Sequence, residues 1–229
     1  MKGYGQFCPI AKAAEIVAEK WSIIIIREIL AGSRTFNALR KGIPLISPTL
    51  LSRRLVELED AHIIKKLETG KRKPKYHYLP DSAAIDLGPI LMQLGDWGNK
   101  WAVSDLRKED YDPRLLMWVI SRGIELSEFD DQNKYVVRFD FQGTPRSISR
   151  WWLVISREEV DVCLKDPGHE VNLYVKSHIK LMTEVWMGWV DLPKARRDGL
   201  IQFDGLNSDV KNFSKWFKLN VFARRDGLA

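Results

Sequence analysis

Residues 46–59 read ISPTLLSRRLVELE, and this stretch decides how the first half of the chain folds. Ser47 is a favourable N-cap, because its hydroxyl can accept a hydrogen bond from the first turn of a helix. Pro48 then takes the first helical position, where a missing N–H removes no hydrogen bond. The apolar residues that follow have the spacing of an amphipathic helix, and they are Leu50, Leu51, Leu55 and Leu58.

The opposite face of this helix carries Thr49, Ser52, Arg53 and Val56. Hydroxyls and a guanidinium on one helix face are typical of a helix that lies in the major groove of DNA. An ordinary surface helix shows the same pattern, so the neighbouring segments decide between the two interpretations. Arg54 can either face DNA or pair with Glu57, three residues further on.

The flanking segments predict a helix-turn-helix followed by a wing. A long buried helix is expected over Ala13–Leu30, a short helix over 34–41 and a turn over 42–44. Two strands are expected after the 46–59 helix, at Ile63–Glu68 and Lys75–Leu79. The loop between them carries Lys71, Arg72 and Lys73, which in a wing contact the phosphate backbone. A solvated loop tip is the alternative interpretation of these three cations.

The positive charge of the chain is concentrated in the same region. The whole chain has a formal net charge of +6, whereas residues 34–75 hold eleven Lys or Arg and four Asp or Glu. A local excess of this kind indicates a polyanionic partner. Hydrophobic residues make up 45% of the chain, which is enough for a folded core. A length of 229 residues suits one large domain or two ordinary ones.

The sequence gives no sign of secretion, membrane insertion or catalysis. Cys8 and Cys163 lie too far apart to suggest a disulfide framework. No apolar run approaches the length of a bilayer, and the N-terminus has no signal-peptide pattern. The histidines lack metal-ligand spacing, and neither a phosphate-binding glycine loop nor a nucleophile–base pattern is visible. We therefore expect a cytoplasmic protein that uses no metal or cofactor, contacts no membrane and is not an enzyme.

A further helix is predicted beyond the wing, over Asp86–Trp101. Its apolar positions follow one another at helical spacing, and they are Ile90, Leu94, Trp97 and Trp101. A stripe of this length suits the contact between two copies of the chain. A helix folded back on its own domain is the alternative.

The second half of the chain predicts an α+β domain after a polar linker at 104–113. Strands are expected at 135–141, 150–155, 159–164 and 172–175, and helices at 112–123, 177–189 and 208–218. Six of the nine tryptophans lie here and either fill a core or line an apolar pocket, namely Trp118, Trp151, Trp152, Trp186, Trp189 and Trp216.

Several spaced motifs of the first half resemble the HxlR-type winged helix-turn-helix transcription regulators, which are relatives of MarR. The motifs are Cys8–Pro9, Glu19–Trp21, Arg27–Leu30, Phe36–Leu39, Ile46–Pro48, Leu51–Leu55 and Leu58–Glu59. The resemblance covers residues 8–106 and implies a dimeric DNA-binding protein, with the 47–59 helix in the major groove and the 67–76 hairpin as its wing. It also makes Cys8 a candidate redox sensor, and a small buried residue at a helix start is the alternative.

Motifs in the second half resemble a sterol-carrier-protein-type domain. They are Phe139–Phe141, Trp151–Val154, Asp166–Gly168, Val185–Gly188 and Gly205–Leu206. The resemblance implies that residues 107–229 form a sheet covered by helices around an apolar cavity, which serves effector binding or dimerisation.

These observations lead to an α+β protein with a winged helix-turn-helix domain at 8–106 and a sterol-carrier-like domain at 107–229. The first hypothesis is a transcription regulator that binds a pseudo-palindromic operator in double-stranded DNA as a homodimer, and that responds to an apolar small-molecule effector. The expected DNA contacts are Arg34, Ser47, Thr49, Ser52, Arg53, Lys71, Arg72 and Lys73. The alternative is an apolar-ligand carrier whose basic half docks it on an acidic partner.

Overall fold

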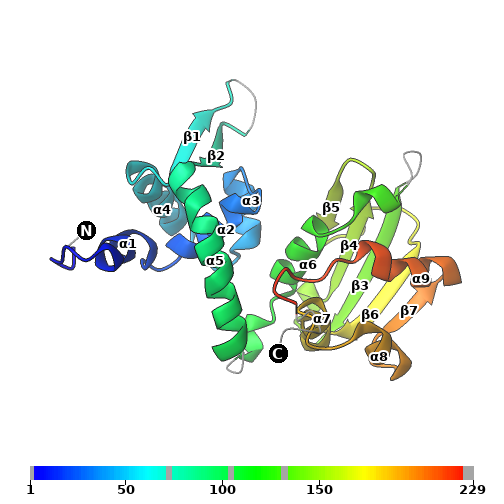
Figure 1. The fold of residues 1–229 in the computed structure, drawn as a ribbon. Helices are drawn as coiled ribbons and strands as arrows, with labels where there is room; N and C mark the ends of the chain where they lie inside the picture. The colour runs from blue at the N-terminus through cyan, green and yellow to red at the C-terminus, as the bar shows by residue number, and fades with distance from the viewer. Residues whose placement is uncertain (1–2, 71–73, 103–105, 130–133, 224–229) are drawn as a thin grey trace. The chain divides into compact units, whose positions relative to one another are not determined.

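The computed structural model describes residues 3–70, 74–102, 106–129 and 134–223. The chain divides into two compact units, Met1–Val103 and Ser104–Ala229, each with its own buried core (Figure 1). Helices and strands occur in both units, so the α+β class predicted from the sequence is confirmed. The proposed functional boundary between residues 106 and 107 stays a prediction.

The N-terminal unit contains helices and one hairpin. In chain order they are α1 (Pro9–Val17), α2 (Ser22–Leu30), α3 (Phe36–Gly42), α4 (Pro48–Asp60), β1 (Ile64–Glu68), β2 (Tyr76–Pro80) and α5 (Ser82–Trp101). The two strands are antiparallel, with Lys66 opposite Tyr78. This order matches the helix-turn-helix and hairpin that the sequence predicts.

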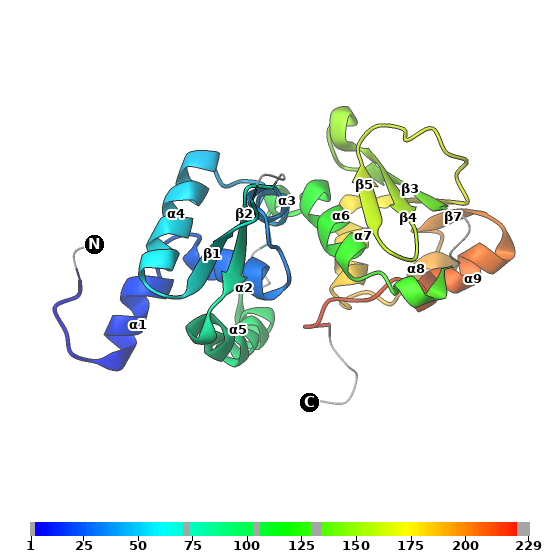
Figure 2. The same cartoon turned by 90° about the horizontal axis from the view of Figure 1, so that it is seen from above.

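The core of the N-terminal unit is centred on α2, which is buried along most of its length. Ile25, Ile26 and Ile29 of α2 are fully buried, because the helix is enclosed by the other elements of the unit. Leu51, Leu55 and Leu58 place α4 against this core, and α4 runs beside the hairpin (Figure 2). The polar face of α4 is therefore turned away from the core.

The prediction of one helix over Ala13–Leu30 is wrong, because the helix is interrupted between α1 and α2. Trp21 has φ 81°, in the left-handed region, and a side chain with a Cβ does not continue an α-helix there. The break is held from outside the segment, since the carbonyl oxygen of Lys20 accepts a hydrogen bond of 3.1 Å from Arg54 Nε. Helical periodicity alone does not reveal such a distant contact.

The C-terminal unit is a mixed five-stranded sheet with helices. Its helices are α6 (Pro113–Arg122), α7 (Ile179–Trp186), α8 (Leu192–Arg197) and α9 (Asn207–Trp216), and short 3₁₀ turns occur at Lys108–Asp110, Leu126–Glu128 and Arg146–Ile148. Its strands are β3 (Tyr135–Gln142), β4 (Arg150–Ile155), β5 (Val160–Cys163), β6 (Leu173–His178) and β7 (Gln202–Gly205). The strand order is β5-β4-β3-β6-β7, in which only β3 and β6 pair in parallel.

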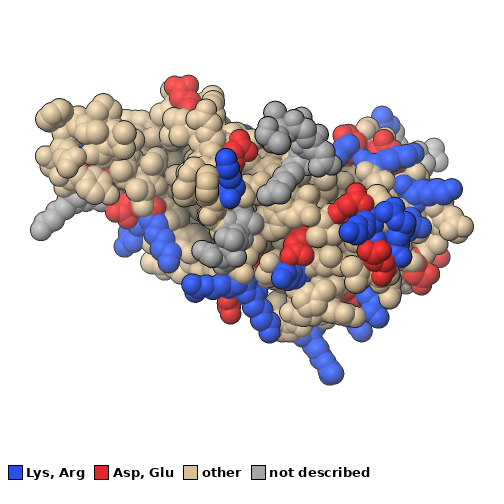
Figure 3. All heavy atoms as spheres, turned by 60° about the horizontal axis from the view of Figure 1, so that its bottom comes forward, with Lys and Arg blue, Asp and Glu red and all other residues tan. Residues whose placement is uncertain are grey.

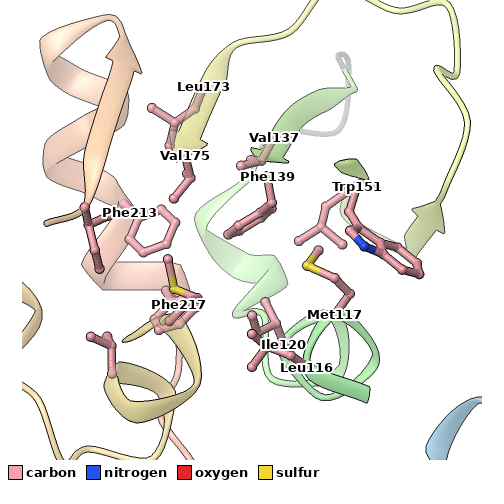
Figure 4. Packing of buried hydrophobic residues seen from close by; sticks show 14 of the residues in the cluster. Leu116, Met117, Ile120, Val137, Phe139, Trp151, Leu173, Val175, Phe213 and Phe217 are labelled. Atoms are coloured by element: carbon pink, nitrogen blue, oxygen red, sulfur yellow. The ribbon is translucent and has the colours of Figure 1, made fainter. Parts of the chain in front are cut away.

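Helices α6, α7 and α9 lie on one face of this sheet (Figure 1). Phe139 of β3 and Val175 of β6 point from the sheet toward Met117 of α6 and Phe213 of α9 (Figure 4). The predicted alternation of β3 is confirmed, because Val137, Phe139 and Phe141 all belong to this core.

Several elements of this unit differ from the sequence-based expectation. The expected helix at 177–189 begins only at Ile179, because Ser177 and His178 continue β6, where they lie opposite Phe141 and Gln142 of β3. The sequence also gave no prediction of α8 and β7, which are too short to show a clear period.

Candidate nucleic-acid interface

Helix α4 is capped and oriented as its sequence predicts. The Ser47 hydroxyl accepts a hydrogen bond of 3.2 Å from the backbone N–H of Leu50, and Pro48 occupies the first helical position. Leu51, Leu55 and Leu58 are at most 2% exposed, and Leu50 is half-buried. The apolar side of α4 is therefore fixed by the core.

The other side of α4 is open to solvent. Its exposed residues are Ser47, Thr49, Ser52, Arg53 and Val56. The Arg53 side chain is 62% exposed, and its Nε lies 3.7 Å from Glu57 Oε1, which is a loose surface pair. Hydroxyl and guanidinium donors thus stand on one accessible helix face, as direct readout of base edges requires.

Arg54 has a structural position, which removes the ambiguity left by the sequence. Its side chain is only 8% exposed, and it donates hydrogen bonds of 2.5 Å to Glu57, 2.7 Å to Glu19 and 3.1 Å to the carbonyl oxygen of Lys20. Burial lowers the pKa of this guanidinium, but the hydrogen bonds that it donates to Glu57 and Glu19 outweigh burial and raise its pKa overall. Arg54 therefore ties α4 to the break between α1 and α2.

Arg34, a predicted phosphate contact, is half-buried and takes part in the fold. Its Nη1 donates a hydrogen bond of 2.6 Å to the carbonyl oxygen of Ile29, near the end of α2. Its own carbonyl oxygen accepts a hydrogen bond of 2.8 Å from the N–H of Tyr78 in β2. Arg34 thus links α2 to the hairpin, a role that the sequence alone did not indicate.

The predicted phosphate contacts at the tip of the hairpin, Lys71, Arg72 and Lys73, lie outside the described residues. The described part of the hairpin adds further cations. Lys66 Nζ lies 4.2 Å from the ring centroid of Tyr76, and Lys75 Nζ lies 5.1 Å from it. A hydrogen bond with Tyr76 raises the pKa of Lys75. Both lysines belong to the basic segment at 34–75 that the sequence shows. Their common contact with the Tyr76 ring could not be predicted from the sequence.

A buried carboxylate lies where α2, the turn that follows it and α3 meet. Glu28 is 2% exposed; its Oε2 accepts a hydrogen bond of 3.0 Å from Ser33, and its Oε1 accepts one of 2.9 Å from Arg27. Gly42 lies so close that a Cβ there would be 2.1 Å from Glu28 Oε2. A glycine is therefore required where α3 approaches α2.

Helix α5 carries two apolar faces. Leu87 and Leu91 pack against the core of the N-terminal unit. The predicted stripe faces solvent instead, since Ile90, Leu94, Trp97 and Trp101 are 45% to 64% exposed. The left part of Figure 3, which is the N-terminal unit, is mostly free of charged side chains. The stripe is thus not folded back onto its own unit.

Cys8 stands at the N-cap of α1, directly before Pro9, and is half-buried. Cys163, the other cysteine, lies in β5 of the second unit. Within the described ranges, no three His, Cys, Asp or Glu side chains gather as they would around a metal ion. No described helix is both long enough and apolar enough to cross a membrane.

The tryptophans of the C-terminal unit mostly fill its interior. Trp151, Trp152 and Trp216 are at most 6% exposed, and Trp118, Trp186 and Trp189 are half-buried. Trp216 packs edge-on against Phe213, with 4.7 Å between ring centroids. A pocket of about 430 Å³ opens at the end of the sheet. Several polar side chains and no tryptophan line it, but most of its exposed wall is apolar.

A short capped helix with an open polar face, preceded by a helix and a turn and followed by a basic hairpin, defines a helix-turn-helix DNA-binding protein. Comparison with known proteins agrees. A family model described as HxlR-like helix-turn-helix matches residues 16–105. The chain belongs to this family of transcription regulators.

Two relatives illustrate the similarity. The uncharacterized HTH-type transcriptional regulator YdeP of Bacillus subtilis (strain 168) is 30% identical over 94 residues, which are 41% of this chain and 73% of YdeP. The uncharacterized regulator YvaP of the same organism is 29% identical over 97 residues, which are 42% of this chain and 90% of YvaP. Among solved structures, the reduced form of the transcriptional regulator YodB from B. subtilis is 24% identical, with a TM-score of 0.37, and the match covers 42% of this chain and 96% of YodB.

Proposed function

We propose that the protein binds a pseudo-palindromic operator as a homodimer, with one α4 helix in each half-site and roughly one helical turn between the half-sites. The observation that carries this proposal is the division of α4 into a buried leucine side and an open side with hydroxyls and a guanidinium. Thr49, Ser52 and Arg53 have the donors and the exposure that contacts with base edges require.

The phosphate contacts come from residues around α4. Ser47 lies exposed at the start of α4, where a helix N-terminus favours an anion. Arg34 uses one of its N–H groups for Ile29, and a guanidinium has further donors for a phosphate. Lys71, Arg72 and Lys73 complete the set at the tip of the wing. In this arrangement, phosphate contacts hold the protein in register and α4 reads the sequence.

The homodimer is supported by the exposed stripe on α5. Four large apolar side chains on one helix face are an unusual exposure for a monomer, and a second copy can cover them. Pairing of two α5 helices would give a two-fold symmetric dimer, which is the symmetry of a pseudo-palindromic operator.

We further propose that residues 8–106 form the DNA-binding domain and that residues 107–229 form a regulatory domain of the sterol-carrier type. A sheet with helices packed on one face supports this resemblance. The packed interior of the domain speaks against the alternative function, an apolar-ligand carrier. Cys8 stays a candidate for redox sensing, since its thiol is half-exposed at the start of α1.

The decisive experiment replaces Arg53 with alanine and measures binding to the DNA upstream of the protein's own coding sequence. Loss of one base-edge contact should weaken specific binding by about 1–3 kcal/mol, or roughly five- to 150-fold. Gel shifts at several salt concentrations also show whether the salt slope falls by about one, as loss of a phosphate contact requires.

Arg150→Ala is the matched control, because its side chain is 65% exposed but belongs to the C-terminal unit. It should leave binding unchanged. Equal affinities of the Arg53→Ala variant and the unmodified protein, for specific and nonspecific DNA alike, would refute the assignment of α4.

A further inference from the structure

Val56 is an apolar side chain on the open face of α4, where it is 51% exposed. It does not belong to the apolar cluster that fixes the other side of the helix. Valine is also a poorer helix former than alanine, leucine or lysine, so an exposed helix position gains no stability from it. A single exposed apolar residue is common on protein surfaces, but this one lies among the proposed DNA contacts.

Val56 continues the row of residues that are proposed to contact base edges. Positions i, i+3, i+4 and i+7 share one side of an α-helix, and here they are held by Thr49, Ser52, Arg53 and Val56. With a rise of about 1.5 Å per residue, this row is roughly 10 Å long. Successive base pairs of B-DNA are about 3.4 Å apart, so the row spans about three base pairs. An α4 helix that lies along the major groove would thus bring Thr49 and Val56 to different base pairs.

The row ends at Val56, because the next residue on this side of the helix is acidic. Asp60 lies about one turn beyond Val56 and is exposed. DNA phosphates repel its carboxylate, so we expect α4 to leave the groove beyond Val56. Val56 is therefore the last residue of α4 in the expected contact with bases.

Thymine is the base that presents a methyl group in the major groove. The other groups that distinguish base pairs there are hydrogen-bond donors and acceptors. The two methyl groups of Val56 can form no hydrogen bond, so they cannot recognise those groups. Contact with the thymine methyl group removes apolar surface of both partners from water. A polar base edge at the same place would lose its hydration without gaining a hydrogen bond.

We infer that Val56 selects a thymine in each half-site of the operator, through contact between its methyl groups and the C5 methyl group of that base. This role rests on the proposed function, in which α4 lies in the major groove. It adds an apolar contact to the hydrogen bonds of Thr49, Ser52 and Arg53. Deoxyuridine is the matched probe for such a contact, because it lacks only this methyl group.

The test begins with selection of bound duplexes from random-sequence DNA by the full chain. The selected consensus is then synthesised with deoxyuridine in place of thymidine, at one symmetric pair of positions at a time. At one such pair, loss of the methyl groups should weaken binding by about fourfold per half-site, or about 15-fold for both half-sites together. The same DNA change should weaken binding of the Val56→Ala variant by less than about twofold.

Two comparisons exclude other causes of the loss. A change in DNA shape or stiffness caused by deoxyuridine would weaken both protein variants equally. Val221→Ala is the matched control, because Val221 is 73% exposed in the C-terminal unit, and this variant should show the full loss with deoxyuridine. Val56→Ala should also be at least as stable as the unmodified protein in urea denaturation, since alanine is the better helix former.

The experiment distinguishes the role of Val56 from the proposed function itself. Arg53→Ala may weaken binding to the consensus while no deoxyuridine position separates Val56→Ala from the unmodified protein. In that case α4 binds DNA and the role of Val56 is refuted. A consensus without thymine in its half-sites would refute this role as well. If the full chain enriches no sequence, both the role of Val56 and the proposed operator binding are wrong.

Discussion

Arg53 and Arg54 are neighbours in the sequence, but their side chains occupy opposite environments. Arg53 is mostly exposed on the open face of α4, whereas Arg54 is buried among Glu19, Glu57 and the backbone of Lys20. One turn of helix thus supplies both a proposed DNA contact and the anchor of the helix. The two residues should respond very differently to substitution.

Arg54→Ala should lower the free energy of unfolding by about 2 kcal/mol. The substitution leaves two carboxylates and a carbonyl oxygen without their donor, although partial exposure of Glu19 and Glu57 limits the loss. Arg53→Ala is the matched control and should change stability by less than about 0.5 kcal/mol. Urea denaturation measures both, and equal effects would contradict the anchoring role.

The sequence predicts the solvent-exposed residues of α4 better than the positions of the charged residues around it. The leucine spacing fixes which side of α4 is buried, so the exposure of Thr49, Ser52 and Arg53 follows from local sequence. The contacts of Arg34 and Arg54 could not be predicted, because they depend on carbonyl groups presented by other segments.

At the scale of elements, the first residues of α5 connect it to the hairpin. Asp81 caps α5 through the N–H of Ser82 and lies 2.9 Å from Lys65 Nζ of β1. The hydrogen bond from Lys65, together with the one from Ser82, lowers the pKa of Asp81 below its ordinary value of 3.8. Ionised Asp81 is therefore the form that stabilises the folded protein.

Asp81→Asn should reduce stability near neutral pH and have a diminishing effect in acid. The pKa of Asp81 is lower in the folded protein than in the unfolded protein. Its charge therefore stabilises the fold fully at a pH above the pKa of the unfolded state. The stabilisation is lost as the pH falls through the pKa of the folded state. Asparagine keeps the capping oxygen, so the variant isolates the charge. The urea midpoints of the variant and the unmodified protein should differ at about pH 7, and the difference should be smaller at about pH 3. A difference in urea midpoint that is the same at both pH values would contradict this account. Lys65→Gln removes the partner of Asp81 and should show the same pH trend.

The apolar stripe of α5 makes a second prediction at this scale. Deleting the helix would also remove Leu87 and Leu91 from the core, so a single exposed residue is the better target. Trp97→Glu should convert the dimer to a monomer in light scattering, because it buries an unpaired charge in the proposed contact. Leu206→Glu, at a residue that is 70% exposed in the second unit, should leave the mass unchanged. A dimer that persists in the Trp97→Glu variant would place the contact elsewhere.

The errors in predicting elements have a common physical origin. The break at Trp21 is stabilised by Arg54, and the extension of β6 to His178 depends on pairing with β3, so both are set by partners distant in sequence. Elements with a long apolar period, such as α4, α5 and α6, were predicted within a few residues. The pocket at the end of the sheet had no signal of its own in the sequence, since its lining comes from three separate stretches of the chain, at residue 142, at 176–184 and at 199–202.

At the scale of the whole molecule, the two units have separate buried clusters with no residue in common. Phe213 is 1% exposed at the centre of the C-terminal cluster, and Phe213→Ala should destabilise that unit by about 3–5 kcal/mol. In calorimetry, this variant should lower the midpoint temperature of one of two unfolding transitions, whereas Leu55→Ala should lower the midpoint temperature of the other. A single transition that shifts in both variants would show that the units unfold together.

The exposed stripe on α5 would also make the stability of the protein depend on its concentration. If a second copy covers Ile90, Leu94, Trp97 and Trp101, each tenfold rise in protein concentration adds about 1.4 kcal/mol to the stability of the folded dimer. While most of the protein is monomeric, the amount of dimer rises with the square of the total concentration. Operator occupancy would then respond more steeply than linearly to the synthesis of the protein. The same four side chains would thus set both the stability of the regulator and the sharpness of its response.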